Sequence, residues 1–279
     1  MPNLFDVANH FDDIAVTDGY TGASLFKAQF STFNGASPDG STSQRRVISM
    51  APGLTLPLRG AITALEETSL VGLGTKDGIY GEAIRQSFWT KRITDTFEKL
   101  TPGEAALGTA GTSLYGHKSY LKDTVNSVTN SEYDPFWEIY FTPYENVSKG
   151  DFLKVGALYY RVRSAHLGVS GFTVAASDEL DAGARVSVTF TGTGAYDPVS
   201  DTYATGTTTV YGLMLDRYKW YEQLTPADRQ SLAGDMTLTV AISSITPVIG
   251  KDLTISSKPW KILNITAFSD AWELHIRRA

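Results

Sequence analysis

The stretch Gly150-Asp151-Phe152-Leu153-Lys154-Val155, followed by Tyr159-Tyr160-Arg161-Val162, has a second version near the end of the chain. There Gly250-Lys251-Asp252-Leu253-Thr254-Ile255 is followed by Trp260-Lys261-Ile262, and the two versions align without a gap. In each version a glycine precedes a short apolar strand, and a second strand begins with aromatic residues. A repeated supersecondary unit of this kind predicts two related domains.

A second likeness lies before each version of this stretch. Arg92 to Pro102 and Arg217 to Pro226 both end in Leu-Thr-Pro, and the later copy carries Tyr218, Trp220 and Tyr221. Tyrosine and tryptophan are typical anchors of protein–protein interfaces, so these three aromatic residues are predicted interface residues. A sugar-binding platform is the alternative reading of the same side chains.

The last third of the chain has the period of β-strands. Arg185 to Thr191 and Met236 to Ile242 alternate apolar and polar residues, as half-buried strands do. Turn residues separate these short strands, which is typical of a small barrel or sandwich. We therefore predict a mainly β protein with two tandem small β-barrel or sandwich domains, an N-terminal helical arm and long loops. The predicted boundaries are an arm and polar linker over 1–45, a first β-rich domain over 46–182 and a second barrel over 183–279.

The N-terminal segment has a different pattern. Leu4, Val7, Phe11, Ile14 and Ala15 recur at helical spacing among acidic and amide residues, which predicts an amphipathic helix. This helix would lie on its own domain or dock on a neighbouring subunit, and Leu4, Val7 and Phe11 are the predicted contact residues. Residues 34–43 form a polar tract typical of a loop or linker. Further on, Ile62 to Glu67 is the candidate for a brief helix.

Composition and charge restrict the function. The chain has no cysteine, which excludes disulfides and thiolate metal sites. Its formal charge of −6 provides no basic footprint for nucleic-acid recognition. The first residues lack the basic start and apolar run of a secretory signal, and no stretch is apolar for long enough to span a bilayer.

Catalytic chemistry has no local signal in the sequence. The four histidines, His10, His117, His166 and His275, are scattered and show no metal-ligand spacing. The glycine-rich run over 72–78 lacks the Gly-Lys-Ser/Thr ending of a phosphate-binding loop. We predict no catalytic residue, no metal and no cofactor, and therefore a protein that is not an enzyme.

Residues 184–279 resemble the head-closure (stopper) and neck proteins at the head–tail joint of tailed bacteriophages. The resemblance lies in a strand over Thr208 to Leu215, then Gly234-Asp235 opening the strand to Ile242, and Pro247 before Gly250-Lys251-Asp252. A strand over Leu253 to Ile255 turns into a strand over Trp260 to Ile265, and a final strand ends at Ile276-Arg277-Arg278. Lys251 interrupts the usual Gly-Asp pair, and the chain is more than twice the usual length of the family.

The resemblance implies a structural virion protein. Such proteins form a homo-oligomeric ring between the portal or adaptor protein and the tail terminator or tail tube protein. They close the head, offer the tail an attachment surface, and let packaged DNA pass without sequence-specific binding. The implied location is the virion neck, after assembly in the host cytoplasm. The alternatives are another tail structural protein (tail terminator, tube or baseplate hub), a carbohydrate-binding adhesion module, or an enzyme with dispersed catalytic residues.

Overall fold

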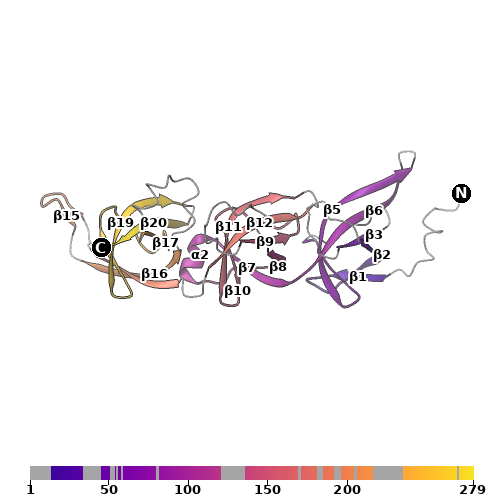
Figure 1. The fold of residues 1–279 in the computed structure, drawn as a ribbon, viewed down its shortest axis with the longest axis horizontal. Helices are drawn as coiled ribbons and strands as arrows, with labels where there is room; N and C mark the ends of the chain where they lie inside the picture. The colour runs from indigo at the N-terminus through magenta and orange to yellow at the C-terminus, as the bar shows by residue number, and fades with distance from the viewer. Residues whose placement is uncertain are drawn as a thin grey trace, which may run out of the picture. The chain divides into compact units, whose positions relative to one another are not determined.

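The fold is mainly β and consists of small closed barrels. The computed structural model describes residues 14–33, 45–50, 54, 56–57, 59–79, 82–120, 136–168, 171–180, 185–191, 196–203, 206–215, 235–268 and 270–279. These residues form three closed barrels of six strands and a separate two-stranded sheet (Figure 1). The predicted mainly β, small-barrel class is therefore confirmed, with three barrels in place of the two expected.

The first barrel is formed by residues before and after the predicted domain boundary at residue 46. Its strand order is β1-β2-β3-β6-β5-β4, and pairing of β1 with β4 closes it. Its strands are β1 (Ile14–Asp18), β2 (Ser24–Phe33), β3 (Arg45–Met50), β4 (Ala61–Ala64), β5 (Glu67–Ile79) and β6 (Glu82–Arg92).

The second barrel contains one short helix in addition to its strands. Its order is β10-β11-β12-β9-β8-β7, and α2 (Pro102–Leu107) lies in the connection between β7 and β8. Its strands are β7 (Asp95–Leu100), β8 (Thr112–Tyr120), β9 (Phe136–Phe141), β10 (Phe152–Val155), β11 (Leu158–Leu167) and β12 (Thr173–Leu180).

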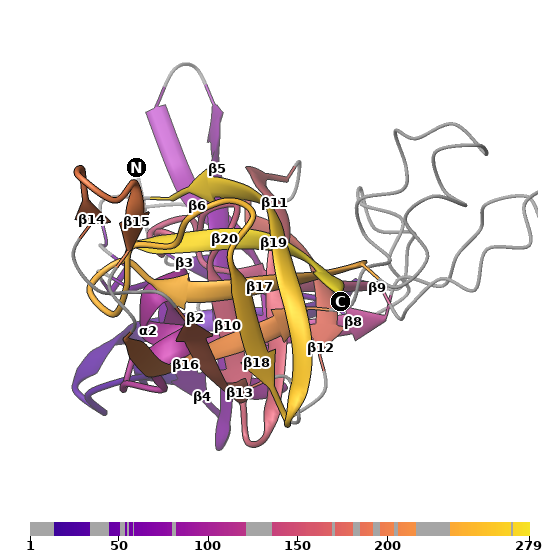
Figure 2. The same ribbon diagram turned by 90° about the vertical axis from the view of Figure 1, so that its left-hand side faces the viewer.

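The third barrel contains a small hairpin at the place that α2 has in the second. Its order is β13-β16-β17-β20-β19-β18, and Figure 2 shows its strands facing the viewer. The hairpin consists of β14 (Tyr196–Asp197) and β15 (Thr202–Tyr203). The barrel strands are β13 (Arg185–Thr191), β16 (Thr207–Leu215), β17 (Asp235–Ala241), β18 (Asp252–Ile255), β19 (Lys258–Ala267) and β20 (Ala271–Arg278).

All three barrels have one topology. We number the six strands of each barrel by their order along the chain. Around each barrel they then follow the order first, second, third, sixth, fifth, fourth, and pairing of the fourth with the first closes the barrel. A glycine with positive φ precedes the fourth strand every time: Gly60 at 66°, Gly150 at 96° and Gly250 at 81°. A side chain is disfavoured at these angles, which explains the glycine at each of the three starts. The fold is thus a triple repeat.

The gapless repeat in the sequence corresponds to two of these three copies. The strands β10 and β11 align with β18 and β19 over their full lengths, and each pair is an antiparallel hairpin. The weaker likeness that precedes them falls at different places in the order of the strands. Arg92 to Pro102 runs through β7 to α2, whereas Arg217 to Pro226 follows the second strand of its barrel and lies outside the described residues.

The predicted N-terminal helix is wrong for those of its residues that the structure describes. Ile14 and Ala15, which belong to the predicted helix, lie in β1, and β2 occupies part of the predicted arm and linker. The boundary at residue 46 falls inside β3. Since β-strand pairing with β2 and β4 decides the conformation of β1, a helical spacing of apolar residues does not override it.

The brief helix predicted for Ile62 to Glu67 is a β-hairpin. Ile62 lies in β4, and Leu65 and Glu66 form the turn to β5 with φ of 51° and 62°. Positive φ at both central residues is the type I′ geometry, whose twist matches that of the flanking strands. In the third barrel Ser256 and Ser257 form the equivalent turn, with φ of 50° and 62°. Here the hairpin context outweighs the helix propensity of Leu and Glu.

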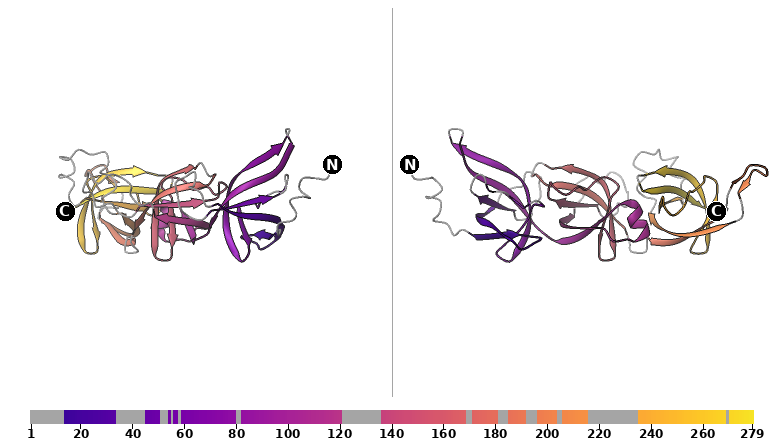
Figure 3. Two further views of the ribbon diagram at one scale, coloured as in Figure 1. Left: turned by 45° about the vertical axis from the view of Figure 1, so that its right-hand side comes forward. Right: turned by 180° about the vertical axis from the view of Figure 1, so that it is seen from behind.

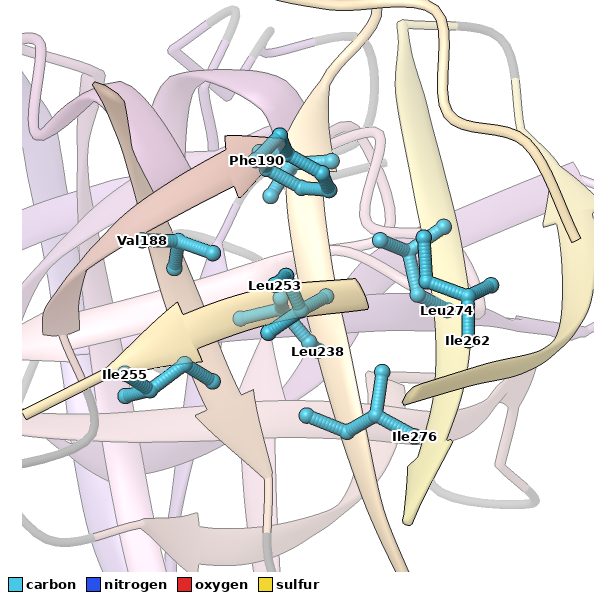
Figure 4. Packing of buried hydrophobic residues seen from close by; sticks show 9 residues of the cluster. Val188, Phe190, Leu238, Leu253, Ile255, Ile262, Leu274 and Ile276 are labelled. Carbon is cyan, nitrogen blue, oxygen red and sulfur yellow. The ribbon is translucent and has the colours of Figure 1, made fainter. Parts of the chain in front are cut away.

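Buried apolar side chains from β13, β17, β18, β19 and β20 fill the third barrel (Figure 4). Inward positions alternate along its strands, so that one face of the sheet supplies the core and the other faces outward. The buried members are Val188, Phe190, Leu238, Val240, Leu253, Ile255, Ile262, Leu274 and Ile276. Trp260 and Trp272 pack against this cluster, in agreement with an alternating strand pattern.

The chain divides into two compact units. One comprises residues 1–97, 113–149 and 162–178, and the other comprises residues 98–112, 150–161 and 179–279. In the part of the chain that the structure describes, no helix has the length and apolar character needed to cross a membrane.

Truncation of the third barrel's core should destabilise that barrel strongly. Leu274 is fully buried, so Leu274→Ala is expected to cost about 3 kcal/mol of unfolding free energy by leaving a cavity. Hydrogen exchange of peptides from β17 to β20 in graded urea measures this cost. The control is Ile249→Ala, because Ile249 is 59% exposed and its loss should change stability by less than about 0.5 kcal/mol. Equal effects of the two variants would contradict the assigned core.

Candidate interaction surfaces

Two aromatic rings join the first barrel to the second. Tyr20, in the turn between β1 and β2, stacks on Tyr115 of β8 with ring centroids 4.3 Å apart and 24° between the planes. The backbone N–H of Tyr115 donates to the Tyr20 hydroxyl at 3.1 Å. Burial raises the pKa of the Tyr20 hydroxyl, which stays protonated at neutral pH. This contact fixes the β1–β2 turn against the second strand of the next barrel.

An arginine completes this junction. The guanidinium carbon of Arg59 lies 3.9 Å from the centroid of the Tyr20 ring, and its Nε is 2.8 Å from Oε1 of Glu145. The Arg59 Nη2 also donates to the carbonyl of Ser113 at 2.7 Å. The planar guanidinium can stack on a ring while its edge donates hydrogen bonds, a combination that lysine cannot provide. The cluster is therefore geometrically specific.

Asp18 holds the turn that presents Tyr20. Its Oδ1 accepts hydrogen bonds from the backbone N–H groups of Tyr20 at 2.8 Å and Thr21 at 2.7 Å. This is an Asx-type turn, in which the side chain substitutes for a backbone acceptor. Burial acts to raise the pKa of the Asp18 carboxyl, but these hydrogen bonds outweigh it and the pKa is lowered.

A lysine is buried between aromatic rings in the same unit. Lys91 of β6 is 2% exposed, and its Nζ lies 3.9 Å from the ring centroid of Tyr140 and 6.0 Å from that of Phe172. The Tyr140 hydroxyl donates to Oε2 of Glu138 at 2.6 Å. A cation over the faces of two rings gains electrostatic energy that partly offsets its loss of hydration. Lys91 thus connects the first barrel to β9 and the β11–β12 connection of the second.

The short helix α2 joins the second barrel to the third. Thr101 and Glu104 form a capping box at its start: the Thr101 side chain accepts from the Glu104 N–H, and the Glu104 side chain accepts from the Thr101 N–H. The helix lies against β16 and β17 (Figure 3, right-hand view). The N–H of Gly103 donates to Oδ2 of Asp270 at 3.1 Å.

The C-terminal end of α2 receives an arginine from the third barrel. Arg185 donates from Nη2 to the carbonyl of Leu107 at 2.6 Å and from Nε to that of Ala106 at 3.3 Å. These carbonyls have no partner within the helix, and a cation favours this end of the helix dipole. Gly108, with φ of 71°, ends the helix; a Cβ there would lie 2.7 Å from the Arg185 guanidinium carbon, so the contact needs a glycine.

A buried ion pair and an apolar cluster complete the second junction. Arg161 of β11 donates from Nη2 to Oε2 of Glu273 in β20, whose side chain is 4% exposed. Leu213 of β16 is fully buried beside Leu100 and Phe152 of the second barrel. A buried carboxylate requires such a partner, because an unpaired charge away from water is costly.

The interface residues predicted from the sequence lie outside the described residues. This applies to Leu4, Val7 and Phe11 and also to Tyr218, Trp220 and Tyr221. Sequence reasoning missed the two junctions, since their members are far apart in the chain. The one available signal was Thr101-Pro102-Gly103-Glu104, which has the threonine-to-glutamate spacing of a capping box.

Several of the described ionisable groups form these junctions, among them Arg59, Glu145, Arg161 and Glu273. In the described part of the chain, no three His, Cys, Asp or Glu residues are grouped in a way that could hold a metal ion. His117 uses Nδ1 in a hydrogen bond with the carbonyl of Arg92 at 2.8 Å.

Comparison with known proteins identifies no relative: no family model, no curated protein and no solved structure matches this chain.

Removal of Arg161 should destabilise the second junction. Arg161→Met leaves the Glu273 carboxylate buried without its partner, and we expect a loss of about 3 kcal/mol in unfolding free energy. Urea-induced unfolding measures the loss, and adding Glu273→Gln to the same chain should recover part of it. Lys261 has the equivalent position in β19 and is exposed, so Lys261→Met is the control with a change below about 0.5 kcal/mol. Equal losses at the two sites would contradict the role of the ion pair.

The stability of the β1–β2 turn, which presents Tyr20, should fall at acid pH. A lowered folded-state pKa means that Asp18 contributes stability above its unfolded pKa of about 3.9, and that this contribution disappears as pH falls through the folded pKa. A carboxyl-carbon NMR titration should place Asp18 below about 3.9, with the amide signals of Tyr20 and Thr21 shifting together. Asp18→Asn should remove this coupled shift, and a titration at or above about 3.9 would contradict the described turn.

Proposed function

We propose that this chain is a structural virion protein of the phage neck, which forms a ring between the portal or adaptor protein and the tail. In that place it closes the head and offers the tail an attachment surface. The observation that carries the proposal is the third barrel. Its strands β16 to β20 occupy the segment that resembles head-closure proteins, and they belong to a closed barrel with a filled apolar core.

The other two barrels extend this proposal. They have the same strand order as the third barrel, so the chain would be an enlarged head-closure protein with three barrels per subunit. A ring of such subunits would display three times as many barrels as chains, in stacked layers or in a ring of higher symmetry. The net charge of −6 suits a channel through which DNA passes, because like charges oppose adsorption of the phosphate backbone.

The distribution of polar chemistry also supports a structural role. Buried charges such as Lys91 and Glu273 are used where one barrel meets another within a compact unit. Their partners hold these charges in a fixed geometry, and a connector between head and tail needs such fixed contacts. An enzyme would instead bring ionisable groups together around a substrate.

Mass photometry of the purified chain, alone and with the portal protein of the same phage, tests the proposal. A neck protein should form a ring at an integer multiple of 30.3 kDa or add such a multiple to the portal. Immunogold electron microscopy of virions should then place it at the head–tail joint. Labelling at the tail tube or baseplate would favour another tail protein. A chain that stays monomeric, does not bind the portal protein and binds sugars on a glycan array would favour an adhesion module.

A further inference from the structure

One connection in the barrel has the same role at both junctions. The connection between the first and second strands of the first barrel carries Tyr20, which packs on Tyr115 in β8 of the second barrel. The same connection in the second barrel carries α2, which packs on β16 and β17 of the third. Both β8 and β16 are the second strand of their barrel. The repeat therefore includes a donor connection that contacts the second strand of the next barrel, joined at the second junction by the third strand, β17.

The third barrel has its own donor connection. Between β13 and β16 lies the β14–β15 hairpin, in which Tyr196 pairs with Tyr203 and Asp197 with Thr202. Val199 in its turn is 94% exposed, the largest exposure among the exposed large hydrophobic residues of the described chain. Burial of the Val199 side chain against a partner would remove apolar surface from water, which favours association.

The first barrel has the corresponding acceptor. Its second strand, β2, is the counterpart of β8 and β16. On β2, Lys27 is exposed, while Leu25 and Phe26 are half-buried against the barrel core. Asp201, beside Val199 in the hairpin turn, is exposed and acidic. The hairpin turn, as donor, thus has a negative charge and β2, as acceptor, has a positive charge, each near apolar side chains.

We propose that the β14–β15 hairpin of one chain binds β2 of the first barrel in a second copy of this chain. A second copy is favoured over an unrelated partner because both internal junctions already join barrels of this strand order. The contact is heterologous, since the donor and acceptor are different surfaces, and a heterologous contact produces rings when its rotation closes. The inference rests on the proposed function only for the premise that the chain self-associates.

Sedimentation velocity of the full chain between about 0.1 and about 100 µM measures this contact. Val199→Asp places a charge at the apolar tip and should weaken self-association at least about tenfold. Leu167→Asp is the matched control, because Leu167 is 56% exposed and lies in the second barrel, which supplies neither surface. Circular dichroism of each variant verifies that the fold is kept.

A mixing experiment separates head-to-tail contact from other arrangements. Lys27→Glu should weaken the acceptor, so each of the two variants keeps one intact surface. Mixed together, Val199→Asp and Lys27→Glu should form a heterodimer through the remaining pair and no larger species. A hairpin-to-hairpin contact would instead prevent Val199→Asp from binding the wild type.

The outcomes distinguish this inference from the proposed function. Wild-type self-association that Val199→Asp or Lys27→Glu leaves unchanged would overturn the inference, and a neck ring with another interface would remain. A wild-type chain that is monomeric throughout would overturn the inference, and portal binding would then decide the neck assignment separately.

Discussion

Closure of each six-stranded sheet is the constraint on which the rest of the structure depends. Pairing of the first strand with the fourth, as in β1 with β4 and β13 with β18, gives the backbone hydrogen bonds partners all around the barrel. It also makes the sheet's inner face the core, because alternate side chains point inward. A barrel closed in this way interacts with other proteins through its connections and outward side chains. The interactions that join the barrels are found in those places.

The connections differ although the strand order is the same. Between the first and second strands, the first barrel has a tight turn with Tyr20, the second has α2, and the third has the β14–β15 hairpin. Because the sheet supplies its own core, this connection is free to vary without disturbing the barrel. Each junction therefore has its own chemistry: aromatic stacking with an arginine at the first, and a capped helix with an ion pair at the second. Variation of this kind makes one barrel sequence distinct from the next.

The sequence predicts the second and third barrels far better than the first. Gly150 and Gly250 mark equivalent strand starts because both need positive φ, and the hairpins that follow alternate visibly. The first copy has the same glycine at Gly60, but its hairpin turn is Leu65-Glu66, which has the composition of a helix. The shared Leu-Thr-Pro misleads in the opposite way. Its residues match in the two copies, but the copies lie at different places in the order of the strands. Neither junction was predictable, because Tyr20 and Tyr115, or Arg161 and Glu273, are brought together by the fold alone.

We infer that the buried charges at the junctions contribute to specificity more than to stability. An apolar pair of similar volume in place of Arg161 and Glu273 would avoid the cost of desolvation, so the ion pair is not the most stabilising choice. It does penalise every arrangement in which either charge faces a different neighbour. Lys91 is placed in the same way, since its ammonium group lies over the faces of Tyr140 and Phe172. For a chain built from three barrels of one topology, the main hazard is pairing of the wrong barrels, within a chain or between copies. Charges that are satisfied at one junction only exclude such mispairing, and we infer that this is why they are buried there.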